Sequence, residues 1–121
     1  MNQDVLPLVS LYGIPNCDTV KKAKKWLEEK GIDYQFFNFK KDGINPDDVS
    51  RWIDQTGIDL VLNKRGTTWR KLSPQKQAYQ TNEELINLIC EQTSLVKRPV
   101  LEIDSHVHVG FKPDMYEELF K

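Results

Sequence analysis

Long hydrophobic runs are missing from this sequence, and so is an excess of charge of either sign. No stretch approaches the roughly 20 apolar residues that a membrane-spanning helix needs. The first residues, MNQDVLPLV, also lack the basic segment that opens a secretory signal. We therefore expect a cytoplasmic protein rather than a membrane or secreted one.

The charges of the chain nearly balance, which excludes several classes of partner. Its 121 residues include 17 basic and 18 acidic ones, for a formal net charge of -1. A nearly neutral protein has no broad attraction for nucleic acid or for an anionic membrane surface, so we expect neither as a partner. The length suits one domain with its own hydrophobic core, and we predict a single domain over residues 1–121.

Cysteine is also scarce, because only Cys17 and Cys90 occur and they lie far apart. Such spacing fits neither a disulfide scaffold nor a CxxC zinc pattern, and it suits a reducing compartment. Cys90 follows isoleucines at helical spacing, which favours packing over a role as a resolving cysteine. His106 and His108 share one side of a predicted strand, but no third ligand is suitably spaced, and we predict no metal site.

What the sequence does contain is a strand, a turn and a helix arranged around one cysteine. Residues 8–12 form a β-rich run that meets a Gly-Ile-Pro turn, and an amphipathic helix follows and ends at Gly31. Asn16 or Asp18 is expected to cap this helix, which puts Cys17 in its first turn. Free N–H groups, the helix dipole and nearby lysines favour a thiolate there. Cys17 is the predicted nucleophile, with an ordinary buried cysteine as the alternative.

The remaining patterns predict an α/β fold. A second strand is expected at residues 34–39, parallel to the first because a βαβ crossover is right-handed, so that Cys17 lies at the carboxyl edge where such sheets bind ligands. A helical insert follows at about residues 46–92. A hairpin within residues 100–109 and a short helix from Pro113 complete the order β-α-β, helical insert, β-β-α.

The insert contains sequence signals for three helix N-termini and two segments that we expect to be loops. The starts are Asn45 before Pro46, Ser73 before Pro74, and a capping box formed by Thr81 and Glu84. Residues 40–46 are rich in turn formers, and residues 63–71 form a basic loop with Trp69. Trp69 is expected to pack on the insert rather than to stack on a nucleobase.

Four segments of the chain resemble the family of the arsenate reductase ArsC, Spx and YffB. They are YGIPNCDTVKKAKKWLEEKGIDY, LNKRGTTWRKL, KRPVLEID and GFKPDMYEELF. The resemblance spans about residues 8–120 and is strongest to the YffB branch. It implies a thioredoxin-like mixed sheet with the element order given above.

The resemblance also implies roles for individual residues. Cys17 matches the family's nucleophile, Arg98 matches an arginine that faces it, and Pro99 matches a proline that the fold keeps cis. Cys17 and Arg98 are therefore the expected catalytic residues. The residues expected to bind substrate are Asn16, Arg65, Pro99 and Lys112.

Three positions depart from the family's better-known branches. Gly13 stands where arsenate reductases have a histidine, and Lys112 stands where oxyanion-reducing members have a second arginine. Lysine offers a point charge instead of the planar fork of arginine, so arsenate reduction is disfavoured. Val20 replaces the second cysteine of the CxxC switch of Spx, which excludes a local disulfide switch.

Together these features predict a glutathione-dependent thiol oxidoreductase with a single active cysteine. Cys17 is expected to attack a small-molecule or protein disulfide, and glutathione or glutaredoxin to complete the cycle, without any permanently bound cofactor. Reduction of arsenate or another oxyanion is one alternative. A second is an Spx-like regulator that binds a protein such as RNA polymerase.

Overall fold

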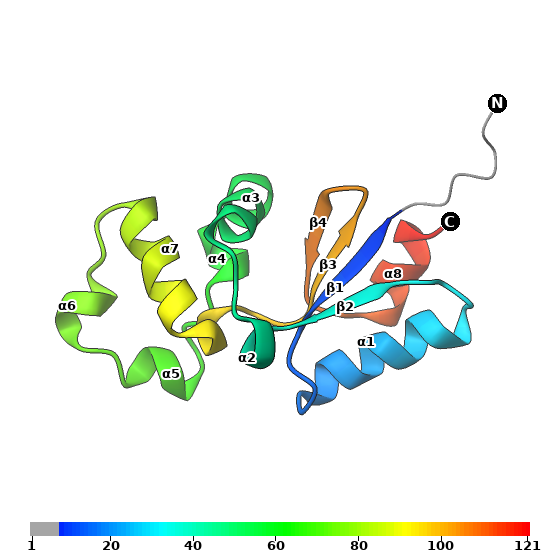
Figure 1. Cartoon of the computed structure of the whole chain (residues 1–121), viewed down its shortest axis with the longest axis horizontal. Coiled ribbons are helices and arrows are strands. Elements are labelled where there is room, and N and C mark those ends of the chain that lie inside the picture. Colours follow the sequence, from blue (N-terminus) through cyan, green and yellow to red (C-terminus); the bar gives the residue numbers. More distant parts are fainter. Residues whose placement is uncertain (1–7) are drawn as a thin grey trace. The chain divides into compact units, whose positions relative to one another are not determined.

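The computed structural model describes residues 8–121 and separates into two compact units. The sheet unit comprises the chain up to Asn38 together with Arg98–Lys121, and the insert unit comprises Phe39–Lys97. Figure 1 traces both units along the chain. None of the helices in the described residues is long and apolar enough to cross a membrane.

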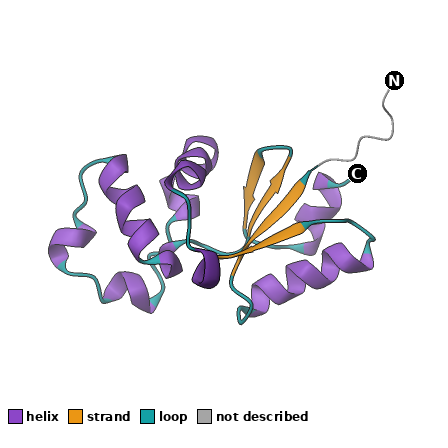
Figure 2. Cartoon of the chain, in the orientation of Figure 1, coloured by secondary structure: helices purple, strands orange, loops and turns teal. Residues whose placement is uncertain are grey.

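The sheet unit is built on a mixed four-stranded sheet. Its elements are β1 (Val9–Gly13), α1 (Asp18–Glu29), β2 (Gln35–Asn38), β3 (Val100–Ile103), β4 (His106–Val109) and α8 (Pro113–Leu119). The strand order is β2-β1-β3-β4, with β1 parallel to β2 and the other neighbours antiparallel. This arrangement confirms the predicted thioredoxin-like α/β sheet and the parallel pairing of its first two strands (Figure 2).

Helix α1 follows the predicted apolar stripe and ends at the predicted glycine. Val20, Ala23 and Leu27 are fully buried on one side of it. At its end the amide of Gly31 donates to the carbonyl of Glu28, and the next amide donates to the carbonyl of Leu27. These two bonds form a Schellman motif, which requires the positive φ of 69° that glycine adopts without strain.

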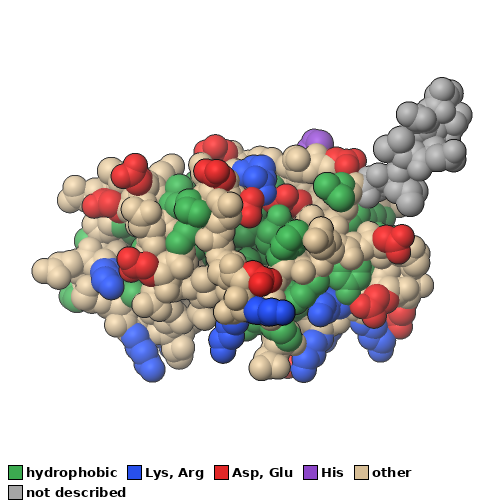
Figure 3. Space-filling model, in the orientation of Figure 1, with side chains coloured by type: hydrophobic (Ala, Val, Ile, Leu, Met, Phe, Trp, Pro, Cys, Tyr) green, Lys and Arg blue, Asp and Glu red, His purple; other side chains and the backbone are tan. Residues whose placement is uncertain are grey.

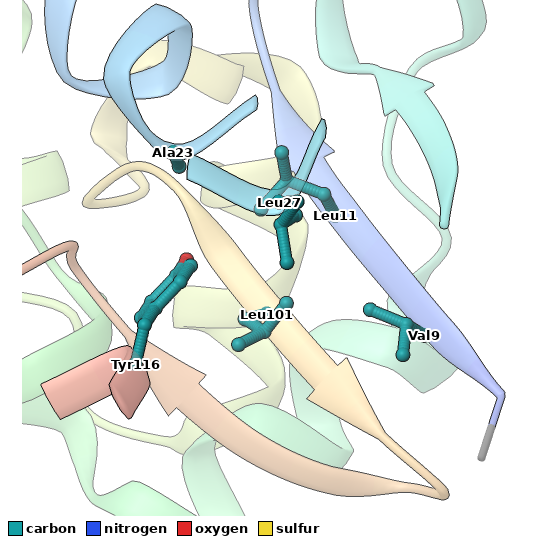
Figure 4. Close-up of a cluster of buried hydrophobic side chains, with 6 residues drawn as sticks. All are labelled: Val9, Leu11, Ala23, Leu27, Leu101 and Tyr116. Atoms are coloured by element: carbon teal, nitrogen blue, oxygen red, sulfur yellow. The ribbon is translucent and has the colours of Figure 1, made fainter. Parts of the chain in front are cut away.

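Helices α1 and α8 cover the same face of the sheet. One buried cluster joins Val9 and Leu11 of β1, Leu101 of β3, Ala23 and Leu27 of α1, and Tyr116 of α8 (Figure 4). Trp26 and Phe111 meet the Tyr116 ring edge to face, with centroid distances of 5.4 and 4.6 Å. This shared core joins α1 to the sheet whose β1 end and β3 start lie side by side.

The insert unit is helical, as predicted. Its elements are α2 (Phe39–Asp42), α3 (Pro46–Thr56), α4 (Ile58–Val61), α5 (Thr67–Arg70), α6 (Pro74–Gln77), α7 (Asn82–Glu91) and the 3-10 turn η1 (Thr93–Leu95). The three predicted helix starts are confirmed: Asn45 accepts from the amide of Asp47, Ser73 accepts from that of Lys76, and Thr81 and Glu84 form a capping box.

Two segments of the insert unit correct the sequence-based expectation. The predicted loop at residues 40–46 begins as the helical turn α2, and the predicted basic loop at residues 63–71 contains the helical turn α5. Phe39 and Trp52 of this unit are buried, with ring centroids 6.0 Å apart. Propensity is a weak guide for single turns, so the sequence pattern alone did not indicate these two.

Candidate active site

The turn between β1 and α1 makes Cys17 the N-cap residue of the helix. Its amide donates to the carbonyl of Ile14 at 3.3 Å, and its own carbonyl accepts from the amide of Lys21 at 2.9 Å. The backbone of Cys17 is extended, with φ -92° and ψ 124°. The expectation that Asn16 or Asp18 caps α1 is therefore wrong. A thiol is a weak acceptor, so the usual capping preferences did not indicate this position.

Antiparallel pairing of β1 and β3 brings Arg98 to the same end of the sheet. Tyr12, near the end of β1, pairs with Val100 at the start of β3. Arg98 and Pro99 come directly before β3, and the peptide bond between them is cis, as the resemblance implied. The carbonyl of Pro99 accepts from the amide of Gly110 at 2.8 Å. The sheet thus holds Arg98 beside the turn that leads from β1 to Cys17.

The surroundings of Cys17 favour its thiolate. Burial acts to raise its pKa, but the main-chain amide of Val20, a hydrogen bond from the Arg98 side chain and the amide of Thr19 together lower the pKa below its ordinary value. The charge of Arg98 adds to this effect. The sulfur makes no regular cap hydrogen bond, so the two amides act as polarising contacts at the helix start.

The lysines of α1 have little part in the site. Basic side chains gather over α1 in Figure 3. Lys24 lies over the Phe36 ring at 3.9 Å, and Lys30 forms an ion pair with Glu117 at 3.5 Å. The cation that acts on the Cys17 sulfur is Arg98. The α1 lysines are thus mainly a solvated face.

The predicted substrate-binding residues occupy different places. Asn16 is exposed and directly precedes Cys17, while Pro99 is buried. Lys112 is the exposed N-cap residue of α8. Arg65 belongs to the insert unit, where it is exposed and its amide donates to Oδ1 of Asn63 at 3.1 Å. The structure brings Cys17 and Arg98 together, and binding of substrate by the other residues stays a prediction.

The second cysteine and the histidine pair have different surroundings. Cys90 is half-buried on α7, where burial raises its pKa. On β4, burial and the neighbouring His106 lower the pKa of His108. Within residues 8–121, no three His, Cys, Asp or Glu side chains are grouped so that they could hold a metal ion. Cys17 is thus the cysteine whose environment favours the thiolate.

Comparison with known proteins agrees with this fold. The ArsC family model matches residues 12–119. The chain belongs to the ArsC family. Among solved structures, this ArsC-family chain is 44% identical to the YFFB (PA3664) protein, covering 91% of this chain and 96% of that one with a TM-score of 0.86.

Two further relatives show the range of this ArsC family. An arsenate reductase (ArsC) related protein from Brucella melitensis is 45% identical, covering 94% of this chain and 95% of that chain with a TM-score of 0.71. The global transcriptional regulator Spx of Listeria innocua is 28% identical over 109 residues, covering 88% of this chain and 82% of Spx. The predicted family resemblance is confirmed.

Proposed function

We propose that this protein is a cytoplasmic thiol oxidoreductase that uses Cys17 to attack glutathione mixed disulfides. The observation that carries the proposal is the hydrogen bond from Arg98 to a half-buried Cys17 at the start of a helix. A thiolate attacks a disulfide and a thiol does not. A lowered pKa therefore increases the reactive fraction of Cys17 at neutral pH.

The reaction proceeds in two exchanges. The Cys17 thiolate attacks the glutathione sulfur of a mixed disulfide, forming a disulfide between Cys17 and glutathione and releasing the substrate as a thiolate that takes a proton from water. The thiolate of a second glutathione then attacks the glutathione sulfur on Cys17. Oxidised glutathione leaves and the Cys17 thiolate returns. One free glutathione is thus consumed per turnover: it leaves joined to the glutathionyl group of the substrate as oxidised glutathione, and the substrate leaves as a thiol. A glutaredoxin thiol can replace the free glutathione.

Cationic side chains are proposed to hold the glutathione carboxylates. Arg98 is at the sulfur, and a guanidinium binds a carboxylate through two parallel hydrogen bonds. Lys112, in the same unit as Cys17 and Arg98, is exposed and is proposed to supply further charge. Asn16, which precedes Cys17 in the chain, and Pro99, which follows Arg98, are proposed to contact the peptide backbone of the bound glutathione.

Mass spectrometry after exposure to oxidised glutathione tests the proposal. We expect one glutathione adduct per chain, located on Cys17 and removed by reduced glutathione. The Cys90→Ser variant should form the adduct at the native rate, and Cys17→Ser should form none at neutral pH. An adduct mainly on Cys90, or none on the native protein, would contradict the proposal.

Reduction of arsenate or a related oxyanion is the second candidate. It is favoured by the guanidinium of Arg98 next to the thiol, and by the similarity to an arsenate reductase related protein. The exposed Lys112 weakens it, because a single ammonium cannot bind two oxyanion oxygens as a fork. Arsenate turnover with glutathione and glutaredoxin should be low in the native protein and higher in Lys112→Arg. Efficient turnover by the native protein would instead favour the oxyanion reaction.

A regulator that binds RNA polymerase is the third candidate. The similarity to Spx favours it. Val20 stands three positions after Cys17, so no local disulfide can switch such binding. Purified RNA polymerase should not bind the native protein if Cys17 chemistry is its function. Equal binding by the native and Cys17→Ser proteins would instead favour a thiol-independent adaptor.

A further inference from the structure

Gly13 at the end of β1 and Val20 in the first turn of α1 leave no room for a side chain at position 13. A Cβ atom placed on Gly13 would lie 2.7 Å from Cγ2 of Val20 and 3.3 Å from its Cγ1. Separations under 3.0 Å essentially never occur for real Cβ atoms. The absence of a side chain on Gly13 is therefore what allows α1 to start this close to β1.

Neither partner of this contact can easily move. Val20 is fully buried, and a β-branched side chain in a helix has one strongly preferred rotamer. Gly13 is buried as well and pairs with Asn38 of β2. A side chain at position 13 would thus displace the backbone at the start of α1.

The same contact determines where the sulfur lies. Residues 14–16 alone connect Gly13 to Cys17, and the amide of Cys17 is tied to Ile14 within that turn. Two donors to the sulfur are the amides of Thr19 and Val20. Both belong to α1, so any shift of the helix start shifts them too. The other donor, Arg98, is held by the sheet through the pairing of Val100 with Tyr12.

We propose that Gly13 is a positioning residue for Cys17. Because Gly13 has no side chain, Val20 packs directly against the end of β1. This packing places the sulfur between the helix amides and the guanidinium of Arg98. This inference rests on the proposed function, because it takes the Cys17 thiolate as the reactive group. It adds that position 13 controls the nucleophile through shape, without touching substrate.

A double-mutant cycle tests this role, with the pKa of Cys17 as the readout. The thiolate absorbance is titrated in a Cys90→Ser background, so that Cys17 is the cysteine that titrates. Gly13→Ala should raise the pKa and slow alkylation at neutral pH by about tenfold, the effect of one pKa unit. Val20→Ala removes the two γ-methyl groups that a Cβ at position 13 would meet, so adding Gly13→Ala in that background should raise the pKa far less than in the native one.

Gly31→Ala is the matched control. It also replaces a glycine next to α1, at the opposite end, where φ is +69° and a Cβ would meet no atom within 4 Å. It should lower stability through backbone strain while leaving the Cys17 pKa unchanged. If Gly13→Ala does not fold, Val20→Ile enlarges the same contact from the helix side and should raise the pKa.

The outcomes separate this inference from the proposed function. An ordinary Cys17 pKa in the parent protein would overturn both. A lowered pKa in the parent that Gly13→Ala or Val20→Ile leaves unchanged would overturn the positioning role alone. A rise in pKa on adding Gly13→Ala that is just as large in the Val20→Ala background would also overturn it.

Discussion

The side chain of Arg98 donates a hydrogen bond to the sulfur of Cys17, joining the second residue before β3 to the residue before α1. A guanidinium keeps its proton at any physiological pH. The sulfur of Cys17 therefore faces a cation on one side and the amides of Thr19 and Val20 at the helix start, and together these groups lower its pKa. The strand order of the sheet brings these groups together.

Replacing Arg98 by alanine should raise the pKa of Cys17. A hydrogen bond to a charged group at a partly exposed site is worth on the order of 1 kcal/mol after solvent screening, about a fivefold change in thiolate fraction. Alkylation by iodoacetamide at neutral pH should slow by a similar factor. Lys30→Ala removes one charge at the other end of α1 and should leave the rate unchanged. Equal rates for native protein and Arg98→Ala would show that the guanidinium does not act on the sulfur.

Stability should depend on pH through Cys17. The pKa of this thiol is lower in the folded protein than in the unfolded chain, where it is about 8.5. The resulting stabilisation is complete above the unfolded pKa and is lost as pH falls through the folded pKa. Urea unfolding should show native protein gaining stability over Cys17→Ser as pH rises toward about 9. If the native protein instead lost stability relative to Cys17→Ser as the pH rises, folding would raise the pKa of Cys17.

Replacing Tyr116 by phenylalanine should stabilise the protein. Tyr116 is fully buried, burial raises its pKa, and within the described residues its hydroxyl has no hydrogen-bond partner. Figure 4 shows this hydroxyl at the inner end of the ring, pointing toward α1. Removing an unsatisfied buried hydroxyl should add about 1 kcal/mol to the free energy of unfolding.

Tyr34→Phe is the control for this gain in the free energy of unfolding. Chemical denaturation measures both variants. The Tyr34 hydroxyl donates to Glu28 at 2.7 Å, so its removal should cost a few tenths of a kcal/mol, or roughly one at most. Lower stability of Tyr116→Phe would show that the buried hydroxyl is satisfied by a bound water molecule.

The capping box of α7 should be a local determinant of stability in the insert unit. Thr81 accepts from the amide of Glu84 at 3.1 Å, and Glu84 accepts from the amide of Thr81 at 3.0 Å. Thr81→Ala should lower the free energy of unfolding by about 1 kcal/mol, and Thr81→Ser by much less. Thermal unfolding followed by circular dichroism measures both. Equal losses would mean that the methyl group matters more than the hydroxyl.

Much of the fold was predictable because its signals are local. The stripe of α1, the caps at Asn45, Ser73 and Thr81, and the hairpin of β3 and β4 depend on residues close in sequence. The short turns α2 and α5 were not predicted, since four residues carry too little periodicity. The resemblance, rather than any local pattern, indicated the cis bond before Pro99.

The site was predictable in its main pair and not in its fine geometry. Cys17 was indicated by its place before a helix, and Arg98 by the family resemblance. The N-cap position of Cys17 was missed because cysteine is not a usual cap. The contact of Gly13 with Val20 was missed because the spacing of residues in the sequence does not give the distance between atoms of a strand end and of a helix turn.

The most direct test of the reactive thiol is the pKa of Cys17 itself, measured by thiolate absorbance in Cys90→Ser protein and checked against Cys17→Ser. The arrangement of Arg98 and the helix amides predicts a value clearly below that of a free cysteine, about 8.5. A value of about 8.5 or higher would contradict the account, because Cys17 would then be mostly protonated at neutral pH.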